Sequence, residues 1–470
     1  MQPEDPRDRR IAELEAKLAR ALARITELEA IVARLSSNST NSSKPPSSDA
    51  PGVTRPSTLP SGKKRGGQPG HQGHQRKLLP PSKVDVVTPL IPKECDHCGA
   101  GLHGRDPNPR RHQVIDIPPI TPTVTEYRLY ALFCDECGQT TRAQLPLGVP
   151  MGSFGPRLSA MLAICTAKYR LSKRAVRELL CDFLGVELSL GSVANVEQQV
   201  SAALEASVHE ACEYVRQAAV VNADETGWRE NKTKAWLWVA VTALVTVFVI
   251  ASRRSSKVAK ELLGETFAGV LGTDRWSAYS WVDATRRQIC WSHLIRDFQG
   301  WVDGGGVGKR LGSQLLREAR RMFRWWHRVR DGTMTRQRFA QKMRSVRLHV
   351  ATLLAQASCC RTQRVRGMAT QILKLETGLW SFINREGVEP TNNSAERQIR
   401  HAVLWRKGCF GTDSTDGSRF VERMLTSIAT LRQQDRNVLE FITSACEAEL
   451  AGSAPPSLLP TSTKVTLALA

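Results

Sequence analysis

Apolar residues recur at alternating spacings of three and four over residues 10–36. Two heptad positions carry them: Ile11, Leu18, Ile25 and Val32 in one, and Leu14, Ala21, Leu28 and Leu35 in the other. Such a repeat predicts a leucine-zipper helix that pairs with a second copy as a coiled coil, so we expect a homodimer or higher oligomer. The span is the minimum for a coiled coil, and the alternative is one amphipathic helix packed on its own chain.

The apolar pattern then stops, and residues 37–85 predict a disordered basic linker rich in Ser, Asn and Pro. Residues 51–84 hold seven Lys and Arg and no acid. Lys63, Lys64 and Arg65 stand among Gly and His, and Gly lets a backbone approach DNA phosphates closely. A solvated basic tether explains this segment equally well.

Helical periodicity returns over residues 153–212. Ser172 is placed to cap a helix that Gly185 would end, and a second helix opens near Ser192. This succession resembles a helix-turn-helix, so we expect DNA contacts here, with Arg174 among them. Helix pairs of this kind are also common in ordinary cores.

Short apolar runs over residues 218–300 predict strands followed by strand–helix alternation, which indicates an α/β sheet. The strands are expected at 220–225, at 236–251 as a pair, at 269–274 and at 288–291, with a helix from residue 293. Two of the runs end on acids, at Asp224 and Asp274. Carboxylates that meet on one sheet edge repel each other unless a cation neutralises them, and Mg²⁺ prefers oxygen ligands.

The most apolar stretch, 236–251, is shorter than the roughly 20 residues of a membrane-spanning helix and is rich in Val and Thr. The polar N-terminus carries no apolar signal segment. We therefore expect a cytoplasmic, nucleoid-associated protein with no membrane partner.

The charge balance points to a polyanion. The chain has 66 Lys and Arg against 45 Asp and Glu, a net charge of +21, which favours nucleic acid first and an anionic membrane surface second. Residues 305–375 hold 17 Lys and Arg against two acids. We interpret 301–388 as a basic helical insertion whose Arg320, Arg321 and Arg324 face DNA. The alternative is a solvated basic face packed on its own aromatic residues.

Four of the 12 cysteines form two Cys-x-x-Cys pairs, each followed by Gly. The pairs, Cys95 with Cys98 and Cys134 with Cys137, can supply four thiolates to a structural Zn²⁺ ion, so 86–147 is expected to be a zinc-binding module. Redox or packing pairs are the alternative, although no βαβ pattern lies nearby to support a redox motif.

Four sequence blocks then occur in order: NADETGW, GVLGTDRWSAY, CWSHLIRDF and TNNSAERQIRHAVLWRKGCFG. Together they resemble the central region of DDE transposases of the insertion-sequence-66 family. The resemblance extends upstream to KKRGGQPGHQGH, CDHCG, CDECG and SKRAVRELL and covers about residues 10–445.

This resemblance implies a ribonuclease-H-like core at 218–300 and 389–447, interrupted by the all-α insertion. Asp224, Asp274 and Glu396 would be its catalytic acids and would hold two Mg²⁺ or Mn²⁺ ions. Cys290 and His293 match a C-x-x-H signature, and we favour a buttressing role over metal binding because two ligands do not complete a zinc site. The remaining matched residues are Asn393, Arg397 and Arg400 as active-site support and Lys407 as a DNA contact.

The implied activity is DNA transposition: cutting at the ends of a DNA element and joining the freed 3′-OH to target DNA. The family also suggests accessory proteins encoded by the same element. Two other readings remain open, a ribonuclease-H-like nuclease without strand transfer and a non-catalytic zinc DNA-binding regulator. Residues 451–470 are expected to be a disordered tail.

Overall fold

The computed structural model describes residues 6–42, 49 and 77–460 and has a mixed α/β architecture. The chain divides into two compact units, Thr54–Thr123 and the remainder. Across the described residues, no helix combines the length and apolarity that crossing a membrane requires.

Helix α1 (Pro6–Leu35) forms over the predicted heptad region as a single helix. Its heptad leucines and isoleucines remain exposed, Leu18 by 60% and Ile25 by 51%. Exposure of this apolar stripe leaves it available to a partner helix.

A five-stranded sheet forms the centre of the larger unit, in the order β5-β4-β3-β6-β7. Its strands are β3 (Val220–Glu230), β4 (Thr233–Val241), β5 (Thr246–Ala251), β6 (Val270–Thr273) and β7 (Arg287–Ile289). The β5-β4-β3 ribbon is antiparallel, and β6 and β7 continue parallel to β3. Strand β3 runs past its predicted end at residue 225, because β4 pairs with it as far as Glu230.

Helices that lie before, between and after the strands in the sequence share one hydrophobic core with this sheet. They are α2 (Pro156–Ala167), α3 (Lys173–Leu184), α4 (Leu190–Ala203), α5 (Glu205–Gln217), α6 (Ser256–Leu263), α12 (Asn393–Cys409), α13 (Thr415–Gln433) and α14 (Val438–Ala451). The predicted caps of α3 are confirmed: the Ser172 side chain accepts from the Ala175 N–H, and Gly185 ends the helix with φ 64°. The helix-turn-helix-like pair thus packs as part of this core.

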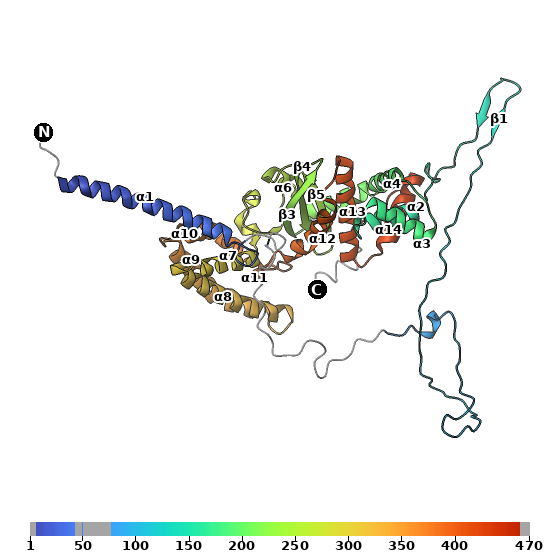
Figure 1. Ribbon diagram of the computed structural model, residues 1–470, viewed down its shortest axis with the longest axis horizontal. Coiled ribbons are helices and arrows are strands. Elements are labelled where there is room, and N and C mark those ends of the chain that lie inside the picture. Colours follow the sequence, from blue (N-terminus) through green and yellow to red (C-terminus); the bar gives the residue numbers. More distant parts are fainter. Residues whose placement is uncertain (1–5, 43–48, 50–76, 461–470) are drawn as a thin grey trace. The chain divides into compact units, whose positions relative to one another are not determined.

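Helix α13 packs along β5, an edge strand of the sheet (Figure 1). Phe248 N–H donates to Thr426 Oγ1 at 3.0 Å, and Thr246 N–H donates to Thr430 Oγ1 at 3.1 Å. Ile250 N–H donates to the Glu422 carboxylate. Side chains one helical turn apart thereby satisfy alternate N–H groups of β5, which would otherwise be an unpaired edge.

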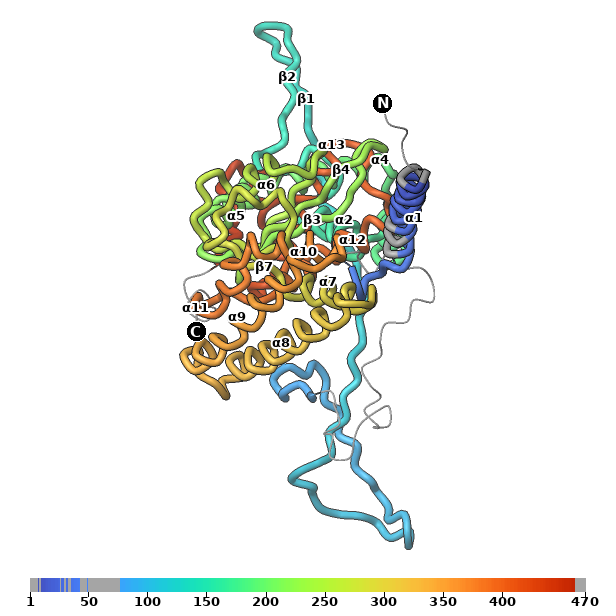
Figure 2. The backbone as a smooth tube through the Cα atoms, turned by 90° about the vertical axis from the view of Figure 1, so that its left-hand side faces the viewer, coloured from blue at the N-terminus to red at the C-terminus, as the bar shows by residue number. Residues whose placement is uncertain are grey.

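The predicted insertion is all-helical and has a hydrophobic cluster of its own, which also contacts the β6–β7 side of the sheet. It contains α8 (Gly306–Arg330), α9 (Arg336–Ser358), α10 (Gln363–Lys374) and α11 (Ser381–Asn384), and it follows α7 (Trp291–Asp303). Figure 2 shows α8 and α9 side by side, with α10 next to α9. The rings of Trp326, Phe339 and Phe382 pack against one another within this cluster in tilted and edge-to-face arrangements.

The prediction of a disordered tail over 451–470 does not hold for residues 451–460, which pack on the body of the protein. Leu458 is fully buried, and its carbonyl accepts from Gln434 Nε2 at 2.8 Å. Ser207 Oγ donates to Pro456 O at 2.8 Å. One leucine in a Pro- and Ser-rich run therefore anchors residues up to 460 on the body, while 461–470 lie outside the described residues.

Replacing Thr426 with Val is expected to lower the free energy of unfolding by about 1–3 kcal/mol, because the buried Phe248 N–H would lose its acceptor. Thr443→Val in α14 is the matched control, since among the described residues Thr443 Oγ1 is buried without a hydrogen-bond partner. Urea denaturation followed by circular dichroism compares the two. Equal midpoints would contradict the capping of β5 by α13.

Candidate active site

The sheet register brings Asp224 and Asp274 together. Asn222 pairs with Gly272, so continuing the parallel register places Asp224 beside Asp274, one residue after the end of β6. The buried Arg287 guanidinium fixes this turn by donating to Thr273 Oγ1 at 2.9 Å and to Asp274 O at 3.0 Å. Asp274 therefore does lie at a strand end as predicted, whereas Asp224 lies within a longer strand.

Asn392 ties a distant part of the chain to this edge. Its side chain is 1% exposed, and its Nδ2 donates to Ala223 O, adjacent to Asp224, at 2.8 Å. Its backbone N–H donates to Cys290 Sγ at 3.2 Å. Helix α12 starts at the next residue, so Asn392 sets where the first turn of that helix lies relative to β3 and α7.

Glu396 stands in that first turn of α12 and faces α7. Its Oε1 lies 3.4 Å from Arg296 Nη2 and 3.6 Å from His293 Nδ1. Burial, together with the charge of Asp274, raises the pKa of Glu396, and Arg296 opposes that rise. Glu396 is thus held against α7 by Arg296, a cation that the sequence alone did not single out.

Cys290, His293 and Glu396 form a compact group whose ligand atoms all lie within 4.8 Å of one another, the one such group of three in the described part of the chain. Burial raises the pKa of the Cys290 thiol to about 11. Burial and the nearby Arg296 lower the pKa of His293 to about 4, so its imidazole is neutral at pH 7. Neutral imidazole is the form that binds metals, and Glu396 gives this group one ligand atom beyond the two counted from the sequence, so the buttressing role stays a prediction.

The three acids interact electrostatically. Burial, followed by the charges of Glu225, Asp274 and Glu396, raises the pKa of Asp224 well above its usual range. The charges of Asp274 and Glu396 thus both act on the Asp224 carboxyl, although among the described residues the three acids do not form a group whose ligand atoms all lie within 4.8 Å of one another. A divalent cation would relieve this repulsion, and the donor set of carboxylate oxygens suits Mg²⁺ or Mn²⁺.

Glu225, next to Asp224, has a separate set of partners, in keeping with its exclusion from the predicted metal ligands. Tyr279 Oη donates to it at 2.6 Å, and Arg254 Nε donates to it at 2.9 Å. The Arg254 guanidinium stacks 3.9 Å from the centroid of Trp276. Glu225 thus attaches the segment after Asp274 to β3.

The other predicted support residues surround α12. Asn393 Oδ1 accepts from Ser292 Oγ at 3.3 Å, while Arg397, Arg400 and Lys407 are exposed. Asn393 was predicted, yet the buried clamp is its neighbour Asn392; the Asn-Asn doublet carries no hint of which side chain turns inward. Arg296 was also missed, although its position three residues after His293 on one helix was a usable clue.

The predicted DNA-contacting residues lie on separate elements. Arg174 is exposed on α3, and Arg320 and Arg324 are exposed on α8. Arg321 instead pairs with Glu318 at 3.6 Å and stacks on Trp325. Lys63, Lys64 and Arg65 lie outside the described residues.

The two Cys-x-x-Cys pairs, one in each unit of the chain, form similar turns. Gly99 N–H donates to Cys95 O, and Gly138 N–H donates to Cys134 O, both at 2.9 Å. Gly99 and Gly138 have φ of 73° and 68°, which explains why glycine follows each pair. The second turn joins β1 (Ala131–Phe133) to β2 (Thr140–Arg142).

Backbone N–H groups also face the thiols of these turns. Those of His97 and Cys98 lower the pKa of Cys95, and those of Cys137 and Glu136 lower the pKa of Cys134. Both turns thus favour thiolates, the form in which cysteine binds metals.

Comparison with known protein families decides the identity. The family described as transposase IS66 matches residues 151–419, more than half of the chain, including all three acids. The chain belongs to the IS66 family of transposases. The zinc-finger binding domain of transposase IS66 matches residues 92–138, and a family of unknown function matches residues 4–77. A search of curated proteins gives no match.

The predicted family resemblance is therefore confirmed. Membership of the IS66 family implies a DNA-processing enzyme that binds DNA, and the DDE family suggests a divalent metal. The zinc-finger match, which covers all four paired cysteines, supports a structural Zn²⁺.

Asp224→Asn is expected to stabilise the metal-free protein at pH 8, since the ionised Asp224 is disfavoured by burial and by its acidic neighbours. The pKa of Asp224 is higher in the folded than in the unfolded chain, so the wild type gains stability as the pH falls. The difference in unfolding free energy between the two proteins therefore becomes smaller as the pH approaches the ordinary carboxyl pKa of about 4. At pH 8 we expect the variant to be more stable than the wild type by on the order of 1 kcal/mol or more. Each kcal/mol corresponds to a rise in melting temperature of about 2–4 °C.

Thermal melts in EDTA from pH 8 to pH 5 measure this gap. Asp283→Asn is the control of opposite sign, because hydrogen bonds from Thr285 lower the pKa of Asp283. A pH-independent gap for Asp224→Asn would contradict the crowding of carboxylates at the site.

Proposed function

We propose that this IS66-family protein cuts DNA at the ends of its element and joins the freed 3′-OH to target DNA. The observation that carries the proposal is geometric: the parallel register brings Asp224 beside Asp274, and the hydrogen bonds of Asn392 hold the first turn of α12, which carries Glu396, against β3 and α7. In the first step water displaces the 3′ oxygen from phosphorus, and in the second the 3′-OH displaces the corresponding oxygen in the target.

The three carboxylates would hold two divalent cations, Mg²⁺ or Mn²⁺. When bound, such ions activate the attacking oxygen and stabilise the leaving oxygen of a phosphoryl transfer. Raised carboxyl pKa values in a metal-free site support this assignment, because crowded, partly buried acids need a counter-charge.

The remaining residues of the site would position Glu396. Asn392 holds the start of α12 against β3, and Arg296 and His293 lie 3.4 Å and 3.6 Å from the Glu396 carboxylate. Cys290, buried beneath them, accepts the Asn392 N–H. On this proposal Cys290 and His293 act as supports and are not metal ligands.

We further propose that the sheet is a ribonuclease-H-like core. Three antiparallel strands followed by two parallel ones, with the helices α8 to α11 inserted before Glu396, support this assignment. The exposed apolar stripe of α1 supports pairing of two chains, which would allow two element ends to be cut together. Basic residues of the 51–84 segment, α3 and α8 would contact DNA phosphates, and accessory proteins of the same element would join the complex.

Cys95, Cys98, Cys134 and Cys137 are proposed to bind one structural Zn²⁺. We expect about one zinc per chain in the purified protein and its loss in Cys98→Ser or Cys137→Ser. Cys181→Ser is the control, since Cys181 is an exposed cysteine of α3 outside the zinc-finger match. Zinc retained in both paired-cysteine variants would contradict this ligand set.

Asp224→Asn, Asp274→Asn and Glu396→Gln should each reduce cleavage and joining on the order of 10²-fold or more, the loss typical of one preorganised electrostatic group. DNA affinity should change little. Glu386→Gln, at an exposed acid ten residues before Glu396, should retain activity. Cleavage and strand transfer are measured on a duplex carrying one element end with Mg²⁺ or Mn²⁺.

The same assay separates the two alternative functions. A nuclease without strand transfer would release the 3′-OH end but form no joined product. A non-catalytic regulator would bind the end without cleaving it, and the acid variants would behave like the wild type. If the wild type forms joined product and each acid variant does not, the result supports transposition and contradicts both alternatives.

A further inference from the structure

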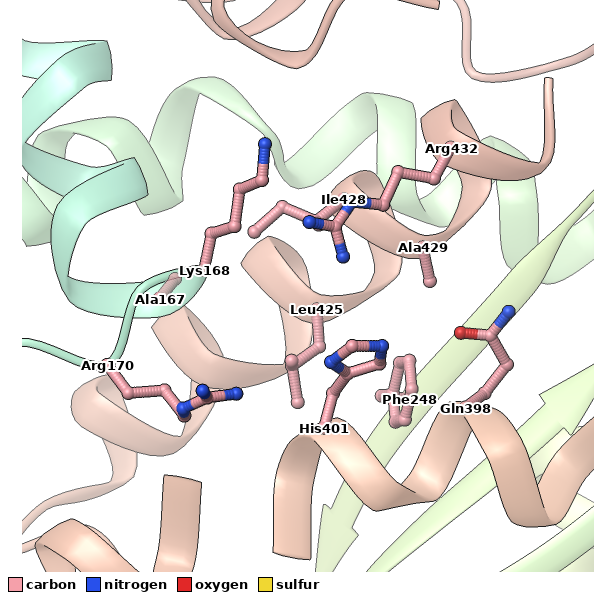
Figure 3. A pocket seen from close by; sticks show the side chains of 10 residues that line it. All are labelled: Ala167, Lys168, Arg170, Phe248, Gln398, His401, Leu425, Ile428, Ala429 and Arg432. Atoms are coloured by element: carbon pink, nitrogen blue, oxygen red, sulfur yellow. The ribbon is translucent and has the colours of Figure 1, made fainter. Parts of the chain in front are cut away.

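A small basic pocket lies where the loop after α2 meets strand β5 and helices α12 and α13 (Figure 3). Phe248 of β5 and Leu425 and Ile428 of α13 give it an apolar floor. The cationic residues that line it are Lys168, Arg170, His401 and Arg432.

The cations of this pocket are not neutralised by acids. In Figure 3 the guanidinium groups of Arg170 and Arg432 point toward His401, while Lys168 extends away and contacts Tyr169. Among the described residues, none of the four basic side chains forms an ion pair, and no Asp or Glu lines the pocket. Burial, then Arg432, Arg170 and Arg400, lowers the pKa of His401.

The guanidinium groups of Arg170 and Arg432 are exposed and, within the described part of the chain, unpaired, in contrast to two arginines that stack on tryptophan rings elsewhere in the molecule. Arg321 of α8 has Glu318, and Arg254 beside the active site has Glu225. Like charges gathered without a counter-charge cost free energy, which an anionic ligand would offset. Arginine is also the side chain best suited to phosphate, because its planar fork donates two parallel hydrogen bonds.

The size of the pocket restricts what can enter it. It encloses about 30 Å³, room for roughly two water molecules. That is enough for the non-bridging oxygens of one phosphate and too little for a nucleobase. The ligand would therefore be read by its charge and not by its base.

We propose that this pocket binds one backbone phosphate of a DNA segment other than the one at the catalytic acids. The inference rests on the DNA binding that family membership implies, and it does not require the proposed chemistry. Glu396 and His401 are five positions apart on α12, which places their side chains about 140° apart around the helix axis. The pocket and the acids thus open on different sides of α12, as a protein that holds two DNA segments requires.

The test uses the full chain with Arg170→Asn and Arg432→Gln combined. Arg170 has φ 61°, a left-handed conformation that Asn tolerates, so the backbone should be preserved. Loss of one phosphate contact should reduce the slope of log Kd against log salt for duplex DNA by about 1. Lys257→Gln is the control, an exposed lysine of α6 paired with Glu261 at 4.0 Å, and it should leave the slope unchanged. Melting temperatures verify that each variant folds.

A second readout is the His401 pKa, followed by NMR in the wild type with duplex DNA or inorganic phosphate as the probe. Bound phosphate should raise it, because the negative charge stabilises the imidazolium. A raised His401 pKa with DNA and a reduced salt slope in the double variant are the expected results. An unchanged slope, or a His401 that responds to inorganic phosphate but not to DNA, would overturn the proposal.

Both readouts are independent of catalysis. The Asp224→Asn variant should keep the wild-type salt slope and His401 response even if it neither cuts nor joins DNA. Failure of the pocket therefore shows in binding alone, whereas failure of the transposition chemistry shows in cleavage and joining.

Discussion

The site depends on one buried side chain, the amide of Asn392. Its Nδ2 donates to Ala223 O of β3 and its backbone N–H donates to Cys290 Sγ, while its Oδ1 is buried without a partner among the described residues. These contacts join segments 169 and 102 residues apart in the sequence. Because α12 begins directly afterwards, these contacts hold its first turn, which carries Glu396, against β3 and α7. Ala395, Ile399 and Trp405 of α12 also pack in the core, so the Asn392 contacts act together with that packing.

The same edge concentrates unfavourable charge. Asp224 and Glu396 are partly desolvated and close to further acids, so their ionised forms are disfavoured in the folded chain. Arg296 partly compensates at Glu396, and Arg254 does so at Glu225. At the β5 edge of the same sheet, by contrast, α13 supplies acceptors to the backbone N–H groups.

Positive charge alone is a poor guide to where DNA binds. The insertion holds most of the net charge, yet Arg321 within it is neutralised by Glu318 and covers Trp325. The pocket on α12 and α13 has fewer cations, but they converge and lack acids. The proposed phosphate site therefore rests on the arrangement of its cations and on the lack of acids around them, not on a local count of Lys and Arg.

Local patterns were enough to determine the elements of this protein: the heptad helix, the strands that carry Asp224 and Asp274, the caps of α3 and the glycines of the Cys-x-x-Cys turns all follow from periodicity and backbone preference. The motif blocks also determined the family. Only the tertiary structure decided which asparagine of the Asn392–Asn393 pair is buried, that Arg296 contacts Glu396, and that residues 452–460 pack on the body. These outcomes depend on contacts between segments about a hundred or more residues apart or on the burial of a single side chain, and neither leaves a periodic trace in the sequence.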